Sequence, residues 1–470
     1  MKRLEIIKEL EKKALQLDPN PEQKTAWNSK VHEYAQNYLS TLDSSKVYRG
    51  ANDESHPFDL NEAPIILQDL LEEQEKFIDS QGINAAAGGH MGYIPGGGLY
   101  PSAMGDFIAA VTNSYAGVYY ASPGAVQLEN ALISWMCRLV GYPKSAVGNL
   151  TSGGSISNLI AVVTAREAQG LKAKDFSNSV VYLSTQAHHS VQKALRIAGL
   201  GESILRYIPL DENLRLDVKK LEEFVENDLT LGLIPFMINA SFGTTNTGAI
   251  DPIEEISKLA EKHKIWFHVD AAYGGFFKLC PELKSKYKGL ELADSITLDP
   301  HKTLFLPFGS GAVLIKNKMA LLAVHHYLAD YLQDAQGAND QLSPADLSPE
   351  LTKHFRGLRL WFPLKLFGIG AFRSALSEKY HLAQYFYSEA QNISHLSLGP
   401  TPELSIVLFR VSSGNEQTRK LLKIIQDDGR VYLSSTSISD VFWIRVAVVH
   451  FRTHLKHIET LLNLLKQNLV

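Results

Sequence analysis

The sequence predicts an α/β protein whose largest domain holds a doubly wound, mostly parallel sheet. The main observation is that short apolar runs alternate with helical segments between about residues 150 and 315. Parallel strands joined by right-handed helical crossovers give this alternation. A second observation is that two of the runs each lead to a charged side chain, Asp270 and Lys302. Ligands of open α/β sheets bind at such strand ends.

Each element is predicted from its own apolar period. In the large domain we expect strands at 180–184, 233–240, 265–269, 294–298 and 311–315, and helices at 155–169, 190–198, 218–227 and 252–263. From about residue 370 the pattern changes. A helix at 370–390, strands near 404–410 and 441–448, and a closing amphipathic helix at 454–468 predict a smaller α+β domain.

The first 80 residues predict two or three helical segments. Apolar residues such as Leu4, Ile7 and Leu10 recur along the first of them with charged residues between, so it is amphipathic. It must pack on another surface, either of the same chain or of a partner subunit. The predicted domains are therefore an N-terminal helical segment at 1–84, a large α/β domain at 85–365 and a small domain at 366–470.

Composition excludes several classes of function. The 470 residues carry 46 Lys and Arg against 50 Asp and Glu, a net charge of −4, so a nucleic-acid surface is not expected. Cys137 and Cys280 have no CxxC spacing, which argues against a disulfide framework and against a metal site. No apolar run is long enough for a membrane span, and no signal peptide is apparent. We expect a cytoplasmic protein.

Asp270 and Lys302 suggest a specific chemistry. Pyridoxal phosphate requires a lysine for its Schiff base and a carboxylate that keeps its pyridine nitrogen protonated, and Lys302 and Asp270 end neighbouring apolar runs. The alternative is a structural ion pair at the edge of the sheet.

The motifs around these two residues resemble those of a known family. The sequences "HVDAAYGG" at 268–275 and "DPHK" at 299–302 resemble the group II pyridoxal-phosphate-dependent decarboxylases, which include aromatic L-amino-acid, histidine and glutamate decarboxylases. The resemblance covers about residues 60–460. It implies fold type I, pyridoxal 5'-phosphate as cofactor, and a homodimer in which the N-terminal helices at 1–84 wrap around the partner subunit.

The turn at 152–155 is the candidate phosphate site. It directly precedes a predicted helix, so backbone N–H groups, the helix dipole and two hydroxyls suit an anion. A plain helix cap is the alternative. The resemblance implies that Gly154 and Ser155 hold the cofactor phosphate together with His301. Asp299 stands where aromatic decarboxylases often carry an amide, although other branches of the family carry "DPHK". A carboxylate there repels phosphate unless it is paired.

Three further residues are candidates for cofactor binding. His188 follows a predicted strand, and its flat ring is suited to stack on a pyridine ring; a surface or cap histidine is the alternative. The resemblance implies that His188, rather than His189, stacks on the cofactor and reaches the substrate. It also implies that Thr245 hydrogen-bonds the cofactor or Asp270, although a locally satisfied turn threonine is as good an interpretation. Ala272 matches a position that packs under the ring.

The glycine-rich stretch at 85–106 is the candidate substrate loop. It contains too much glycine for a regular element and lacks a nucleotide-binding motif. The resemblance implies that this stretch lines the substrate pocket, with His90, Tyr93 and Pro95 as candidate contacts. Its aromatic residues and its lack of an arginine favour an aromatic amino-acid substrate over an acidic one.

The polar segment at 325–362 has the composition of a mobile loop over an active site. Family decarboxylases carry on this loop a tyrosine that protonates the α-carbon after carbon dioxide leaves. The segment from Leu332 to Arg356 contains no tyrosine, and Tyr327 and Tyr331 lie upstream of it. The sequence therefore does not identify the residue that protonates the α-carbon. It also leaves open whether the reaction is strict decarboxylation or a side reaction such as oxidative deamination or transamination.

Together these features predict a lyase that converts an L-amino acid, with aromatic substrates favoured, to its amine and carbon dioxide. Three alternatives remain. The first is another pyridoxal-phosphate reaction, by an aldehyde synthase, an aminotransferase or a carbon–carbon lyase. The second is decarboxylation of an acidic amino acid. The third is a cofactor-binding relative without turnover.

Overall fold

The computed structural model describes residues 2–50, 58, 60, 62–326 and 342–469. They form two compact units, Met1–Ala87 and Gly88–Val470, and each is described by itself. The predicted domain bounds of 1–84, 85–365 and 366–470 stay a prediction.

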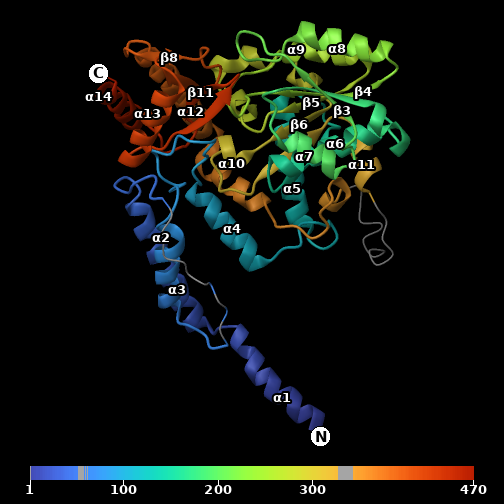
Figure 1. The fold of residues 1–470 in the computed structure, drawn as a ribbon. Coiled ribbons are helices and arrows are strands. Elements are labelled where there is room, and N and C mark those ends of the chain that lie inside the picture. Colours follow the sequence, from blue (N-terminus) through green and yellow to red (C-terminus); the bar gives the residue numbers. More distant parts are fainter. Residues whose placement is uncertain (1, 51–57, 59, 61, 327–341, 470) are drawn as a thin grey trace. The chain divides into compact units, whose positions relative to one another are not determined.

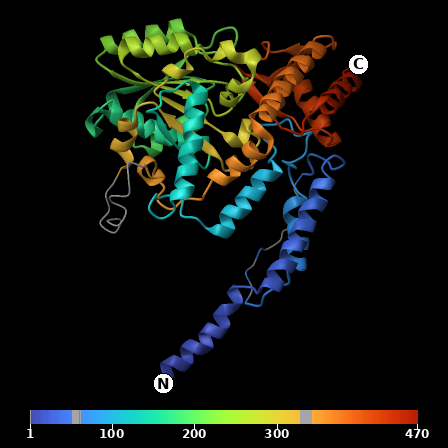
Figure 2. The ribbon, with the colours of Figure 1, turned by 180° about the vertical axis from the view of Figure 1, so that it is seen from behind.

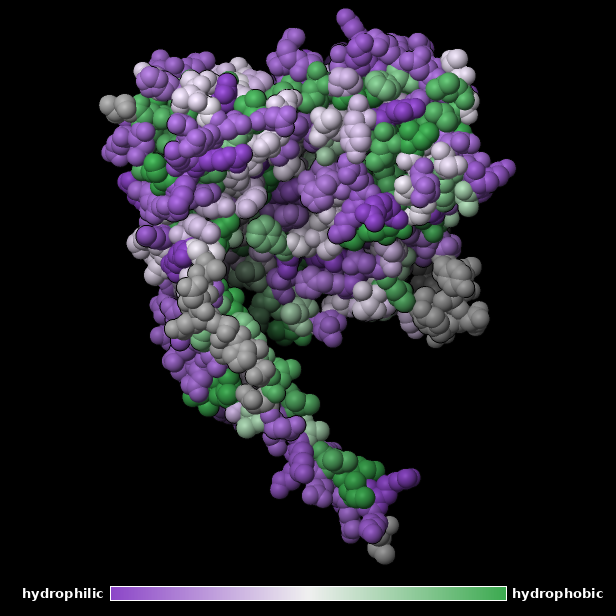
Figure 3. Space-filling model, in the orientation of Figure 1, coloured by the Kyte–Doolittle hydropathy of each residue, from purple (hydrophilic) through white to green (hydrophobic). Residues whose placement is uncertain are grey.

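The first unit consists mainly of helices α1 (Lys2–Ala14), α2 (Pro21–Ser40) and α3 (Leu67–Gln74). Helix α2 starts with a capping box, in which Asn20 and Gln23 each accept a hydrogen bond from the other's backbone N–H. None of the three helices has a buried side chain. Apolar residues of α1 such as Leu4 and Ile7 are exposed. Figure 3 shows a green patch near the N-terminal end of the chain. The predicted amphipathic helix is present, and its partner surface stays a prediction.

The second unit is built around a seven-stranded sheet with the order β1-β7-β6-β5-β4-β2-β3 (Figure 1). Its strands are β1 (Val147–Thr151), β2 (Ser179–Ser184), β3 (Ile204–Ile208), β4 (Ile234–Ser241), β5 (Trp266–Asp270), β6 (Ser295–Leu298) and β7 (Gly311–Ile315). Only the pairs that include β7 are antiparallel, so the sheet is mostly parallel as predicted. Strands β2, β5, β6 and β7 are buried throughout, which explains why they appear in the sequence as continuous apolar runs.

Helices cover both faces of this sheet. Those that surround it are α5 (Pro123–Val140), α6 (Gly154–Ala168), α7 (Ser190–Ile197), α8 (Val218–Thr230), α9 (Ile253–His263) and α11 (Lys318–His325). Side chains of α5, α8 and α9 share one core with Val180 and Tyr182 of β2. Side chains of α6, α7 and α11 share another core with Val181 and Leu183 of the same strand. Because neighbouring strand residues point to opposite faces, these two cores lie on opposite sides of the sheet, as in a doubly wound fold.

The C-terminal part adds a four-stranded antiparallel sheet with the order β10-β11-β9-β8. Its strands are β8 (Leu396–Leu398), β9 (Ile406–Val411), β10 (Ser434–Ile438) and β11 (Val441–Ala447), and its helices are α12 (Gly357–Ala390), α13 (Asn415–Asp428) and α14 (Leu455–Asn468). Helix α12 breaks at Gly368, whose φ of 70° is open to glycine. The predicted helix at 370–390 is the part after this break. Figure 2 shows the α12 to α14 region from behind.

Two further helices of this unit are α4 (Tyr100–Thr112), which packs on α12, and the short α10 (Pro300–Thr303), which follows β6. No helix in the described part of the chain is long and apolar enough to cross a membrane. Within the same residues, no group of three or more His, Cys, Asp or Glu side chains is arranged to hold a metal ion. Cys137 and Cys280 are buried free thiols, and burial raises the pKa of each to about 12.

Candidate active site

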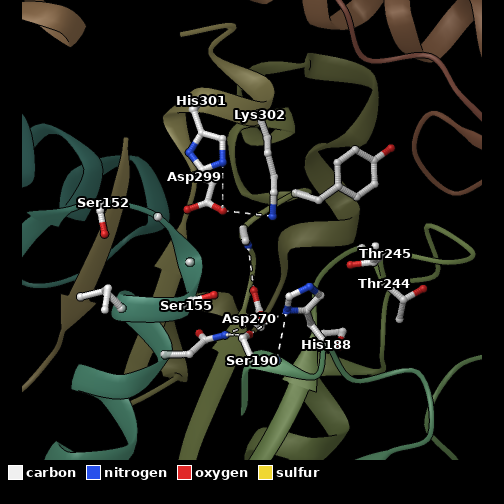
Figure 4. Close-up of a pocket in the computed structure, with 18 of the residues that line it drawn as sticks. Ser152, Ser155, His188, Ser190, Thr244, Thr245, Asp270, Asp299, His301 and Lys302 are labelled. Carbon is white, nitrogen blue, oxygen red and sulfur yellow. Dashed lines mark hydrogen bonds and ion pairs between the residues drawn. The ribbon is translucent and has the colours of Figure 1, made fainter. Parts of the chain in front are cut away.

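A cavity of about 360 Å³ opens at the carboxyl ends of the parallel strands (Figure 4). Its walls come from five connections: those after β1, β2, β4, β5 and β6. The lining residues that matter for chemistry are Ser152, Gly154, Ser155, Asn158, His188, Ser190, Thr245, Asp270, Ala272, Asp299, His301 and Lys302. The sequence analysis had proposed Gly154, Ser155, His188, Thr245, Asp270, Ala272, His301 and Lys302 as cofactor residues, and the structure brings all of them together here.

Lys302 is presented by α10, directly after β6. Its Nζ lies 3.0 Å from Oδ2 of Asp299. The Asp299 carboxylate is buried, and its other oxygen, Oδ1, has no hydrogen-bond partner among the described residues. The carboxylate that the sequence analysis expected to need a partner therefore has one in Lys302. Figure 4 shows the Lys302 side chain pointing from the Asp299 side toward Asp270 and His188.

Asp270 ends β5 and is nearly buried. Its Oδ2 accepts a hydrogen bond of 2.9 Å from Nδ2 of Asn158, and its Oδ1 accepts one of 3.1 Å from the backbone N–H of Ala272. The two donors hold the buried carboxylate in one orientation. Asp270 thus presents a fixed carboxylate to the cavity.

His188 precedes α7, and its Nδ1 lies 2.7 Å from Oγ of Ser190. Burial lowers the pKa of His188. The negative charge of Asp270 raises this pKa, and the positive charge of Lys302 lowers it. The imidazole is therefore neutral near pH 7. A neutral, flat ring beside Asp270 is suited to cover one face of a bound aromatic group.

The turn between β1 and α6 forms the anion-binding end of the cavity. Gly153 has a φ of 149°, which L side chains rarely adopt, and α6 begins at the next residue with 15 residues of aligned peptide dipoles behind it. A Cβ on Gly154 would lie 3.0 Å from Oδ2 of Asp299, so the turn packs directly on that carboxylate. Ser152 and Ser155 line the same end (Figure 4).

His301 closes this end from the other side. Its Nδ1 lies 2.5 Å from the backbone oxygen of Ser310, which can only accept, so Nδ1 carries a proton. Its Nε2 lies 3.8 Å from Oδ2 of Asp299 and stays on the cavity side. The glycine-rich loop packs behind it, because a Cβ on Gly96 would lie 2.1 Å from the His301 backbone oxygen.

The proposed substrate residues His90, Tyr93 and Pro95 are not among the residues that line this cavity in the described single chain. His90 is buried against Tyr432, with ring centroids 5.7 Å apart, and its Nδ1 has no hydrogen-bond partner in the described part of the chain. Tyr93 is 56% exposed and has a φ of 54°. Their role in substrate binding stays a prediction.

Three residues with contacts at or near the site were not predicted from the sequence: Asn158, Ser190 and Arg445. Asn158 lies one helical turn after Gly154, and a polar residue at that spacing on a buried helix was the available signal. Arg445 on β11 is buried and donates to backbone oxygens of Asn246 and Thr245 and to Oγ of Ser434. Burial lowers the pKa of Arg445 to about 10. Ser434 lies opposite Arg445 on the neighbouring strand β10, whereas Thr245 and Asn246 are distant in the chain, so no local sequence signal shows these last two contacts.

Comparison with known proteins decides what this cavity holds. A family model described as the pyridoxal-dependent decarboxylase conserved domain matches residues 51–412. The chain belongs to this family. It is therefore a pyridoxal-phosphate-dependent carboxy-lyase. The predicted fold type I is confirmed by its likeness to solved structures of pyridoxal-phosphate-dependent decarboxylases. The loop residues Tyr327 and Tyr331 and the first part of Leu332–Arg356 lie outside the described residues.

Members of this family with known activities are similar over most of the chain. An aromatic-L-amino-acid decarboxylase of Bacillus atrophaeus is 34% identical over 372 residues, covering 77% of each chain. One of Drosophila lebanonensis is 32% identical, covering 76% of this chain and 92% of the relative. The crystal structure of a Catharanthus roseus tryptophan decarboxylase in complex with L-tryptophan is 25% identical, with a TM-score of 0.89, and the match covers 96% of this chain and 100% of that chain.

The cavity of this family member fits pyridoxal phosphate. Its volume is in the range of small-ligand sites. Lys302 offers the amine that would link to the cofactor aldehyde, and Asp270 the anion for a protonated ring nitrogen. The α6 turn with Ser155 and His301 offers the phosphate site. The unpaired Oδ1 of Asp299 lies at this phosphate end and is the feature that fits a dianion least.

Proposed function

We propose that this protein decarboxylates an aromatic L-amino acid to its amine and carbon dioxide. The observation that carries the proposal is that Lys302, Asp270 and His188 meet in one cavity of a pyridoxal-dependent decarboxylase chain. The relatives at 34% and 32% identity that are named aromatic-L-amino-acid decarboxylases support the choice of substrate class.

The bound cofactor supplies the electron sink that makes loss of carbon dioxide from an amino acid possible. The chain supplies charge and orientation. Asp270, held in place by Asn158 and the backbone N–H of Ala272, would hold the ring nitrogen of the cofactor in its protonated form. His188 is neutral and covers the cavity on the Asp270 side, where it excludes water and restricts how a substrate carboxylate lies.

Arg445 bears on the choice between aromatic and acidic substrates. It is a buried cation near the predicted substrate loop, because its guanidinium also reaches the backbone oxygen of Tyr93 at 3.4 Å. Its donors are directed at neutral acceptors of Asn246, Ser434 and Thr245. A guanidinium that is already engaged in this way supports an aromatic side chain over a second carboxylate in the substrate.

We also propose that the functional unit is a homodimer in the cytoplasm. The exposed apolar side chains of α1, which the described part of the first unit leaves uncovered, support a partner surface of the same chain. The two buried free thiols support a reducing compartment.

A product panel tests this function. Purified protein loaded with pyridoxal phosphate is incubated with L-tryptophan, L-tyrosine, L-phenylalanine, L-histidine, L-glutamate and L-aspartate, and carbon dioxide and amine are measured together. We expect equal amounts of both from an aromatic substrate. Turnover of glutamate or aspartate alone would contradict the substrate class, and aldehyde or keto acid with ammonia would contradict the reaction. The latter outcome corresponds to the alternative raised by the missing tyrosine at 332–356.

A further inference from the structure

Asn158 connects the two groups that face the cofactor. It is 1% exposed. Its Nδ2 donates to Oδ2 of Asp270 and to Oγ of Ser190, both at 2.9 Å. Ser190 in turn contacts Nδ1 of His188 at 2.7 Å. One buried amide therefore reaches Asp270 directly and His188 through a single hydroxyl.

The other end of the same amide is equally engaged. Its Oδ1 accepts from Oγ1 of Thr297 at 2.6 Å and faces Nε2 of His268 at 3.1 Å. Since this oxygen can only accept, Nε2 of His268 carries the proton. All four hydrogen-bonding positions of the Asn158 side chain are thus used. Its orientation is fixed, because a flipped amide would place its NH₂ group against the donors of Thr297 and His268 and its oxygen against the Asp270 carboxylate.

The chain of donors continues away from the cavity. Nδ1 of His268 lies 2.8 Å from Oγ of Ser295, and that hydroxyl accepts from Nε1 of Trp266 at 2.9 Å. His268 is fully buried, and burial lowers its pKa to about 4, so the imidazole is neutral. The donor and the acceptor of each hydrogen bond between Trp266 and Asn158 are therefore assigned.

The same reasoning gives the tautomer of His188. Besides Oγ of Ser190, the backbone N–H of Ser190 points at Nδ1 of His188, at 3.3 Å. An N–H can only donate, so Nδ1 is an acceptor and the single proton of the neutral ring lies on Nε2. The Ser190 hydroxyl is free to donate to Nδ1 because it accepts from Asn158 on its other side.

We propose that Asn158 is a positioning residue that holds the Asp270 carboxylate and the Nε2–H tautomer of His188 in a single hydrogen-bonded unit. The cofactor then meets a fixed anion at its ring nitrogen and an imidazole whose N–H is directed away from Ser190. This inference concerns the cofactor site and is independent of which amino acid is the substrate.

Two readouts that do not require turnover test it. The first is the dissociation constant for pyridoxal phosphate, measured by visible absorbance on the cofactor-free full chain. The second is the solid-state ¹⁵N spectrum of the cofactor-free chain labelled in its histidine rings, which reports which ring nitrogen of His188 carries the proton. The His188 signals are assigned by their loss in His188→Gln.

Three variants test separately the contact of Asn158 with Asp270, its contact through Ser190 with His188, and the more distant contacts that reach Trp266. In Asn158→Leu we expect the dissociation constant to rise about ten- to a hundredfold, because a hydrogen bond to a charged group is lost. Part of His188 should also take the Nδ1–H tautomer, because the Ser190 hydroxyl no longer accepts from Asn158 and can accept from Nδ1, and only the long backbone N–H contact of 3.3 Å opposes this. In Ser190→Ala the hydroxyl contact of 2.7 Å is lost and only the backbone N–H contact remains, so we expect mixed tautomers with cofactor affinity within about twofold of wild type. In Trp266→Phe, which removes a buried donor at the far end, we expect both readouts to stay at the wild-type values.

Thr297→Val keeps the proposal testable if Asn158→Leu does not fold. It removes one donor to Asn158 while keeping the side-chain shape, and we expect it to weaken cofactor binding about threefold and to populate the second tautomer. Wild-type affinity together with a single Nε2–H tautomer in Asn158→Leu, or in Thr297→Val if that is the variant that folds, would overturn the proposal. So would a wild-type His188 that carries its proton on Nδ1.

Discussion

Asp299 is the residue of this cavity whose charge is least suited to a bound phosphate. Its carboxylate lies under the Gly154 turn and pairs with Lys302 at 3.0 Å, while its second oxygen is buried without a partner among the described residues. A phosphate dianion placed at the α6 terminus must tolerate this negative charge, which costs free energy at short range.

Removing that charge gives a direct prediction. We expect Asp299→Asn to bind pyridoxal phosphate up to about tenfold more tightly than wild type, since a like charge is removed from the phosphate site. Equilibrium titration of the cofactor-free protein measures the change, and Glu291→Gln, on the surface of the same unit, is the control. Weaker binding in Asp299→Asn would show that the pairing with Lys302 matters more than repulsion.

The residues predicted from sequence and those missed differ in one physical respect. Lys302, Asp270, His188 and the turn at 152–155 each lie at the end of a strand or the start of a helix, so chain order alone places them at one edge of the sheet. Asn158 and Arg445 act through partners more than 100 positions away, such as Asp270 for Asn158 and Asn246 for Arg445. No local pattern encodes such partners.

At the scale of elements, burial explains which strands were predicted. The expected strands at 180–184, 265–269 and 311–315 agree with β2, β5 and β7 to within one residue at each end, because these strands are buried on both faces. The strands β1, β3, β8 and β10 were not predicted. Gly148 and Asn149 interrupt β1, and β3 is a half-exposed edge strand. Strand β8 has only three residues, and β10 begins with four small polar residues in a row.

A buried ion pair joins the start of α12 to the sheet. Nζ of Lys353 lies 2.7 Å from Oε2 of Glu129 on α5 and 3.0 Å from Oδ1 of Asn149 on β1. The other oxygen of Glu129 accepts from the backbone N–H of Gly357, the first residue of α12. Both side chains are almost completely buried, so neither charge can be left unpaired without a large cost.

We predict that Lys353→Met lowers the free energy of unfolding by about 3–5 kcal/mol, because it leaves the Glu129 carboxylate buried without its cation. Urea denaturation followed by circular dichroism measures the loss. The matched control is Lys423→Met, which breaks an exposed pair with Asp427 and should change stability by less than about 0.5 kcal/mol. Similar losses in both variants would contradict the assigned role of the buried pair.

At the scale of the whole molecule, the exposed apolar side chains of the first unit lead us to expect a homodimer. Its α1 exposes Leu4, Ile7 and Leu10, each more than half exposed in the described structure. We expect light scattering to give twice the chain mass of 52.1 kDa. The double variant Ile7→Glu with Leu10→Glu should shift the protein toward the monomer, while Glu9→Gln should leave the dimer intact. A wild-type monomer at micromolar concentration would contradict the proposed homodimer.

The buried side chain of His90 should make the stability of the fold depend on pH. Burial lowers the pKa of His90 to about 4, below the ordinary value of 6.5. The unfolded chain therefore binds this proton more readily, and the contribution of a neutral His90 is complete above about pH 6.5 and is lost as the pH falls toward 4. At pH 5 this corresponds to a loss on the order of 2 kcal/mol.

Unfolding measured by urea at pH 7 and at pH 5 tests this sign. We expect His90→Phe to lose less stability than wild type between the two pH values, because its side chain takes up no proton on unfolding. His32→Gln, which changes an exposed histidine of α2, should behave as wild type. An equal loss in wild type and His90→Phe would show that His90 makes no contribution in this range.

The stoichiometry of the products tests the central claim most directly. Wild-type protein loaded with pyridoxal phosphate and given a single aromatic L-amino acid should release one carbon dioxide and one amine for each substrate consumed. Lys302→Ala should release neither, and it should also lack the visible absorbance band that borohydride removes from wild type. Ammonia with an aldehyde or keto acid in place of the amine would contradict the proposed reaction, and equal turnover by Lys302→Ala would contradict the site.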